Sequence, residues 1–195
     1  PQALSTSSEE GTKRTWAPEG QGMITSLDDF EAFPWPTPDD LNYRSFRAVE
    51  TILPDGMGVI VFAGAIFSSL MLMMGMEEGL IAMMTGSELF RHLLKRVGEF
   101  QVAVIENLMK YPAVGASWIN DDMGFKSRTL VNPDLFRKYT FPYYREIKTI
   151  VEQHDRPLLL HSDGNITLIL KDLAEIGFNA IHPIEPEAMN IQETR

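Results

Sequence analysis

Residues 157–165 read Pro157-Leu158-Leu159-Leu160-His161-Ser162-Asp163-Gly164-Asn165. The apolar run has the character of a strand that ends at a histidine, with a carboxylate two positions further on. Because alternate side chains of a strand share one face, His161 and Asp163 are predicted to project together from the strand's carboxyl end. Asn165 is a good helix cap, and apolar residues with helical spacing follow it until Gly177, which is a good C-terminal cap. The unit is strand, polar loop and helix, and in α/β folds such loops bind ligands.

The alternation of strands and helices continues through most of the chain. Strands are predicted at residues 57–63, 114–119, 158–161 and 179–184, with helices between them that include a long amphipathic helix at residues 87–110. This alternation indicates parallel βαβ units. Four strands are too few for a closed eight-stranded barrel, which usually needs about 250 residues. The chain is predicted to be an open sheet or a piece of a barrel, and its end, one turn into a helix near Ala188, favours the piece.

The composition divides the chain into residues 1–36 and residues 37–195. The first segment is rich in Ser, Thr, Glu, Gly and Pro and is predicted to be an irregular lead-in. The second is predicted to be the α/β domain. It should begin with a helix that is capped by Thr37, ends before Pro54 and has three apolar residues facing inward: Leu41, Val49 and Ile52.

A later helix carries a start signal and a breaker. Asn132-Pro133 is typical of a cap followed by the first helical position. Pro142 lies inside the apolar pattern that follows, so this helix is predicted to be kinked or divided.

Charge and cysteine content exclude several functional classes. The net charge is −10 and no cluster of Lys and Arg interrupts it, so no nucleic-acid partner is expected. There are no cysteines, which excludes disulfides and thiolate ligands or nucleophiles from this sequence and fits a cytoplasmic protein.

Neither of two candidate segments is expected to be a membrane span or a targeting signal. Residues 57–76 lack formal charges, but their glycines and serines favour a buried strand followed by a buried helix over a membrane span. Residues 1–16 are polar and are not expected to be a signal peptide. No membrane partner is expected.

Polar and ionisable groups follow three consecutive predicted strands. They are Asp121 and Asp122, then His161 and Asp163, then His182 and Glu185. Neighbouring parallel strands lie about 4.8 Å apart, so these side chains are predicted to converge at one mouth. Imidazole and carboxylate groups can hold a divalent metal or perform acid and base catalysis.

Each of these residues also has a purely structural interpretation, which the sequence leaves open. His161 and His182 could make ordinary hydrogen bonds, and the two aspartates could satisfy backbone amides of the next loop. Lys126 and Arg128 could bind substrate carboxylates or could be solvated loop charges.

Three sequence motifs together resemble the uroporphyrinogen decarboxylase superfamily. They are residues 120–124 (Asn-Asp-Asp-Met-Gly), residues 132–144, and the His161-Ser162-Asp163-Gly164-Asn165 run, and their order and spacing match as well. The resemblance is specific over residues 113–186 and weaker over about 22–112. It implies an α/β fold, a TIM (β/α)8 barrel of the uroporphyrinogen decarboxylase type, of which this chain covers about strands 3 to 6.

The resemblance implies one of two chemistries. True uroporphyrinogen decarboxylases need no cofactor, bind the substrate's carboxylates with basic residues and use an essential aspartate near the second strand, outside this chain. The corrinoid-dependent methyltransferases of the family bind zinc through a His-x-Cys pair at the fifth strand and a later cysteine, and the zinc activates a thiol acceptor. His161-x-Asp163 falls where that pair would be, which favours the methyltransferase branch.

The sequence departs from this pattern at Asp163, which replaces the cysteine. A metal held by His161, Asp163 and Glu185 would be more Lewis acidic than one held by thiolates. Alternatively no metal binds, and Asp163 protonates a leaving group. Asp121 and Asp122 are expected to line the same mouth as catalytic groups, with Lys126 and Arg128 binding substrate.

The expected function is methyl transfer between a methylated small molecule and a corrinoid carried by a partner protein, with zinc as the expected metal. One alternative is cofactor-independent decarboxylation of uroporphyrinogen or a related tetrapyrrole. The other is a non-catalytic protein that binds a tetrapyrrole or corrinoid. Because half of a barrel exposes two strand edges and its inner wall, residues 1–195 alone are expected to aggregate or to form a homodimer.

Overall fold

The computed structural model describes residues 5–7, 14–16, 22–190 and 192. Its centre is a parallel sheet in the order β3-β4-β5-β6, so each strand pairs with the next strand along the chain. The strands are Val59–Phe62 (β3), Val114–Asn120 (β4), Leu158–His161 (β5) and Ala180–His182 (β6). All four lie where the sequence predicted strands, although β6 is shorter than residues 179–184.

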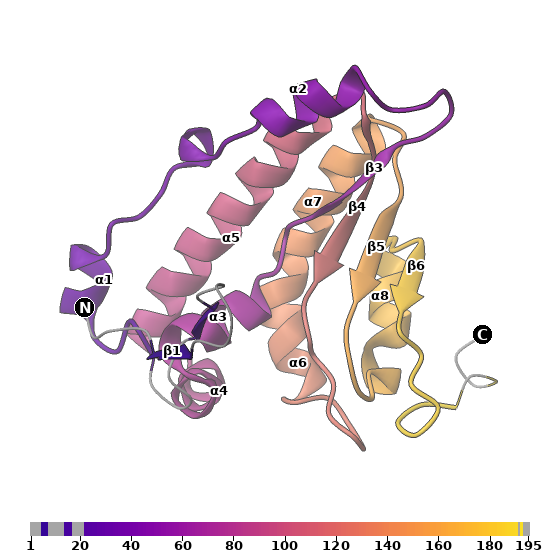
Figure 1. Ribbon diagram of the computed structural model, residues 1–195. Coiled ribbons are helices and arrows are strands. Elements are labelled where there is room, and N and C mark those ends of the chain that lie inside the picture. Colours follow the sequence, from indigo (N-terminus) through magenta and orange to yellow (C-terminus); the bar gives the residue numbers. More distant parts are fainter. Residues whose placement is uncertain (1–4, 8–13, 17–21, 191, 193–195) are drawn as a thin grey trace.

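The connections between the strands place helices on one face of the sheet (Figure 1). These helices are α5 (Glu88–Met109), α7 (Phe141–Gln153) and α8 (Leu170–Ile176). The helix predicted at residues 87–110 is confirmed as α5, whose cap Ser87 accepts a hydrogen bond from the Phe90 amide. Gly177 ends α8 with φ 100°, a conformation that glycine adopts readily, so the predicted cap is confirmed.

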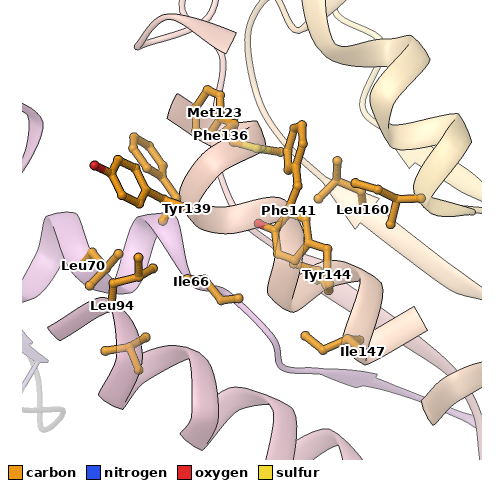
Figure 2. Packing of buried hydrophobic residues seen from close by; sticks show 14 of the residues in the cluster. Ile66, Leu70, Leu94, Met123, Phe136, Tyr139, Phe141, Tyr144, Ile147 and Leu160 are labelled. Carbon is orange, nitrogen blue, oxygen red and sulfur yellow. The ribbon is translucent and has the colours of Figure 1, made fainter. Parts of the chain in front are cut away.

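The core lies between the helices and the sheet. Figure 2 shows part of it, with side chains from α3 (Phe67–Met74) and the segment before it, from α5, from α7 and the segment that leads into it, and from β5. Phe136, Phe141 and Tyr144 are fully buried there, and the ring of Phe67 meets Phe136 edge-on at 5.1 Å. The packing of these large aromatic side chains therefore positions α3 and α7.

The opposite face of the sheet has no layer over it in the described part of the chain (Figure 1). Ile60 and Phe62 of β3 are 46% and 65% exposed on this face. The Phe62 ring stacks on the Trp118 ring of β4, with ring centres 5.0 Å apart. The Trp118 ring in turn lies edge-on to the His182 ring of β6, with ring centres 5.3 Å apart. In a closed barrel this face is the packed interior. The arrangement is that of a partial TIM barrel, and the predicted fold class is confirmed.

Two further helices, α3 (Phe67–Met74) and α4 (Met76–Thr85), join β3 to α5. The uncharged run of residues 57–76 is thus divided between a strand and a helix, as predicted. No single helix in the described residues has the length and hydropathy to cross a membrane, and α3 and α4, bent by 116°, meet that test only when counted together.

The helix after Asn132 is divided, as predicted. It consists of α6 (Pro133–Leu135), a π-helical turn η2 (Phe136–Thr140) and α7. Pro142 has no amide hydrogen for an α-helical bond to the preceding turn. Just before it, the Phe141 amide donates to the Phe136 carbonyl, the spacing of a π-helix.

Residues 37–53 differ from the prediction of one helix. They form a 3-10 turn η1 (Pro38–Asp40) and a separate helix α2 (Arg44–Glu50). Leu41 and Ile52 are 39% and 75% exposed, so the prediction that they face inward is wrong. The side of this segment that faces the protein is instead the one that carries Tyr43 and Phe46, because the rings of both residues pack against Tyr111.

Near Ala188, where the sequence predicted the start of a helix, the structure describes one helical turn, in which the amides of Ala188 and Met189 both donate to the Glu185 carbonyl.

The described part of residues 1–36 is not irregular throughout. β1 (Ser5–Ser7) pairs antiparallel with β2 (Arg14–Trp16), and α1 (Leu27–Ala32) follows. Ser26 and Asp29 form a reciprocal capping box at the start of α1, a pattern that the sequence carries as Ser-x-x-Asp. The division of the chain after residue 36 stays a prediction.

We predict that residues 1–195 alone associate, because no described residues cover the apolar sheet face and β3 and β6 form the edges of the described sheet. The double variant Ile60→Lys, Phe62→Lys should weaken self-association at least about tenfold, because two charges would have to be buried. Ile52→Lys adds a charge at an exposed residue outside the sheet and should change little. Analytical ultracentrifugation measures the outcome, and a monodisperse, cooperatively melting monomer would contradict the prediction.

Candidate metal centre

The strand register brings the ends of β4, β5 and β6 together. Asn120 of β4 lies opposite His161 of β5, which in turn lies opposite His182 of β6. Residues that directly follow these positions therefore meet at the carboxyl edge of the sheet, as the sequence predicted.

Three side chains at this edge form a compact cluster. His161 Nε2 lies 3.6 Å from Asp122 Oδ1 and 3.6 Å from Asp163 Oδ1. One ligand atom from each of the three residues lies within 4.8 Å of the other two. The carboxylates of Asp122 and Asp163 are about half exposed, whereas His161 is mostly covered. The cluster is open to solvent on the side of the carboxylates.

Hydrogen bonds donated by backbone amides hold the two aspartate residues in place. The Asp122 amide donates to Ser68 Oγ at 3.0 Å, and the Asp163 amide donates to Asp122 Oδ1 at 3.1 Å. Ser162 Oγ accepts from the Met123 amide at 2.9 Å, which joins the loop after β4 to the end of β5. The two aspartates therefore belong to one connected pair of loops.

Glycine permits the close approach of these loops. Gly164 has φ 75°, and a Cβ on it would lie 2.7 Å from the carbonyl carbon of Gly124. A larger residue at position 164 would push the loop that carries Asp163 away from the loop that carries Asp122.

Asp121, the neighbour of Asp122, lies elsewhere. It is fully buried, and its Oδ2 accepts from the amides of Ile66 and Phe67, both at 2.8 Å. Its Oδ1 accepts from the Ser68 amide at 2.6 Å, and the Tyr144 hydroxyl donates to Oδ2. The carboxylate thus satisfies the free amides at the start of α3 and ties that helix to α7.

Burial shifts the pKa values of both Asp121 and Tyr144. Loss of hydration raises the pKa of Asp121 above its usual value, against the lowering effect of the hydrogen bonds from Tyr144 and Ser68. Burial and the neighbouring Asp121 raise the pKa of Tyr144 well above its usual value. The phenol therefore keeps the proton that it donates.

The remaining predicted site residues lie around the cluster. Glu185 accepts from the Gly164 amide at 2.9 Å and is not one of the three residues whose ligand atoms converge. Lys126 and Arg128 are exposed on a short hairpin in which Gly124 pairs with Thr129. Phe125 of that hairpin pairs with Asn165, so the two cations lie close in the fold to the loop after β5.

Sequence reasoning missed Ser68, Ser162 and Tyr144. Each supports an aspartate or its loop across 23 to 54 residues of sequence. Ser162 and Tyr144 lie inside the family motifs, which could have pointed to them, but a serine or tyrosine carries no local signal of its distant hydrogen-bond partner.

The donor set fits a divalent zinc ion. Zinc takes histidine nitrogen and carboxylate oxygen at about 2.0–2.2 Å in a tetrahedral arrangement, which places neighbouring ligand atoms about 3.3–3.6 Å apart. The two 3.6 Å separations from His161 Nε2 match this spacing. A neutral imidazole and two carboxylates would also balance the charge of the ion.

Comparison with known proteins identifies the family. The family model for uroporphyrinogen decarboxylase (URO-D) matches residues 1–192. The chain therefore belongs to the uroporphyrinogen decarboxylase family, and this prediction is confirmed. Among solved structures, a methyltransferase from Methanosarcina mazei matches with a TM-score of 0.56 and 18% identity, over 70% of this chain and 38% of that one. This likeness shows a common fold, and the chain spans well under half of that protein. No curated protein matches.

We predict that Asp121→Asn lowers the free energy of unfolding by about 2–3 kcal/mol, because an amide nitrogen cannot accept from the buried donors around it. Asp122→Asn, at the adjacent exposed position, should cost less than about 1 kcal/mol. Urea denaturation of both variants measures the difference, and equal losses would contradict the assigned capping role.

The same comparison has a pH dependence. Because the folded-state pKa of Asp121 is raised, this group contributes most stability below its unfolded pKa and loses it as pH rises through the folded value. The stability advantage of the wild type over Asp121→Asn should therefore shrink with rising pH.

Proposed function

We propose that this chain is part of a metal-dependent methyltransferase of the uroporphyrinogen decarboxylase family. The reaction is the transfer of a methyl group between a methylated small molecule and a corrinoid that a partner protein carries. The observation that carries the proposal is the convergence of Asp122, His161 and Asp163 at the strand ends. Family membership and the fold shared with a methyltransferase support it.

The residues would divide the work as follows. His161 Nε2 and one oxygen from each aspartate would hold zinc, which supplies a Lewis acid that makes a bound thiol or hydroxyl acceptor easier to deprotonate. Each aspartate keeps a second carboxylate oxygen, which can take the acceptor's proton. The exposed side of the cluster is where the acceptor would enter.

The absence of cysteine gives this site harder donors than a thiolate site. Carboxylates transfer less electron density to the metal, so a bound acceptor would be more strongly polarised. An oxygen acceptor is therefore as compatible with the site as a sulfur acceptor.

We predict that the protein binds zinc stoichiometrically and that His161→Ala, Asp122→Asn and Asp163→Asn each weaken binding at least about tenfold, since each removes one ligand. His154→Ala is the matched control, because His154 is an exposed histidine that follows α7, away from the strand ends. Isothermal titration calorimetry and metal analysis measure the effect. Equal zinc binding by wild type and His161→Ala would reject the site.

We predict that Asp163→Cys, which introduces a His-x-Cys pair, tightens zinc binding by about tenfold or more because thiolate is the softer ligand. Its cobalt-substituted form should gain a sulfur-to-metal charge-transfer absorption that the wild type lacks. Asp163→Ser, of similar size but without a thiolate, should bind zinc more weakly than the wild type. An Asp163→Cys protein without that absorption would show that position 163 does not reach the metal.

The exposed cations Lys126 and Arg128 favour a second candidate, decarboxylation of a tetrapyrrole that carries acidic side chains. Neither makes an ion pair with a residue of the described part of the chain, so both are free to bind carboxylates. Turnover of uroporphyrinogen by metal-free protein would support this candidate over methyl transfer. Corrinoid binding without consumption of any methyl donor would instead support a non-catalytic binding protein.

A further inference from the structure

His161 has a second close partner on the side of its ring away from the carboxylates. Its Nδ1 lies 3.1 Å from Nδ1 of His182, and the two ring centres are 5.3 Å apart with 32° between the ring planes. The two residues are register partners of β5 and β6, so the backbone ladder fixes their spacing. Trp118 of β4 also contacts the His182 ring edge-on, with the ring centres 5.3 Å apart.

Two nitrogen atoms at this distance make one hydrogen bond, and a hydrogen bond needs one proton. In a pair of neutral imidazoles, one Nδ1 must therefore carry the proton and the other must accept it. A neutral imidazole carries only one proton on its two nitrogens. The state of Nδ1 in each ring therefore also decides whether Nε2 of that ring is protonated.

The direction of this bond decides what His161 Nε2 can do. If His161 Nδ1 donates to His182, then Nε2 of His161 has a free lone pair directed at Asp122 and Asp163. A lone pair facing two carboxylates at 3.6 Å is repulsive unless a cation lies between them. If His182 donates instead, Nε2 of His161 carries the proton and donates it toward the carboxylates.

We propose that His182 is the positioning residue for His161. Its Nδ1 accepts the Nδ1 proton of His161 and so holds the His161 ring in the tautomer and orientation in which Nε2 serves as a metal ligand. The metal in this inference rests on the proposed function, whereas the hydrogen bond between the two rings does not.

This arrangement leaves His161 Nε2 without a proton, so a cation held by Asp122 and Asp163 would meet its lone pair. The exposed His182 would carry its own single proton at Nε2, where solvent can accept a hydrogen bond from it. Both rings would stay neutral, and the hydrogen bond between their Nδ1 atoms would fix the orientation of the His161 ring.

The matched variants are His182→Phe, which keeps an aromatic ring beside Trp118 but cannot accept, and His182→Asn, whose side chain keeps a hydrogen-bonding atom near the position of Nδ1. His182→Phe should weaken zinc binding about 10–100-fold, the usual effect of losing a partner that orients a ligating histidine. His182→Asn should stay within about threefold of the wild type. Calorimetric titration measures both, and thermal melting checks that the variants fold. Zinc binding by a folded His182→Phe protein equal to that of the wild type would overturn the proposal.

A second measurement needs no variant and no activity. Nitrogen-15 NMR of ring-labelled wild-type protein should show a coupling between the two Nδ1 atoms across the hydrogen bond. The His161 proton should lie on Nδ1, and on addition of zinc the Nε2 resonance of His161 should shift while Nδ1 keeps its proton. If the wild type binds no zinc but shows the coupling, methyl transfer through a metal fails while the positioning of His161 stands. If zinc binds and no coupling is seen, the positioning role fails while the metal site stands.

Discussion

The structure depends on one buried carboxylate, that of Asp121. It accepts from the first amides of α3 and from the Tyr144 hydroxyl of α7, so it joins the end of β4 to two helices at a single point. Ile66, Phe67 and Tyr144 are buried, so their donors would lose their partner if the carboxylate were removed, which makes the contact costly to break. Because it fixes the start of α3, it also places Ser68, which holds the backbone of Asp122.

Two adjacent aspartates therefore have opposite tasks. Successive side chains at the end of a strand point to opposite sides, so Asp121 turns into the layer between sheet and helices while Asp122 faces the mouth. The buried residue secures the scaffold, and the exposed one joins His161 and Asp163. The metal site we propose thus rests on rigid elements, and His182 adds the last constraint by holding the far side of the His161 ring.

Local signals predicted much of the fold. The strand at 158–161, the helix begun by Ser87 and the end of α8 at Gly177 all follow from patterns within a few residues. The prediction of one helix at 37–53 was wrong because the structure of this segment depends on a distant contact, the packing of two aromatic side chains on Tyr111. The approach of Asp122, His161 and Asp163 was predictable in outline, since parallel strands end at one edge. Their 3.6 Å spacing was not, because it comes from loop hydrogen bonds made across about 40 residues.

The sequence by itself determined the family, the alternating strands and helices, and which ionisable residues lie at the strand ends. Each of these follows from periodicity, helix caps or motif spacing, which are patterns of residues close together in the sequence. Only the tertiary structure decided that Asp121 is buried against Tyr144 and that His182 contacts His161. The physical reason is that burial and hydrogen-bond direction depend on what packs from other elements, so identical aspartates side by side in the chain acquire different surroundings.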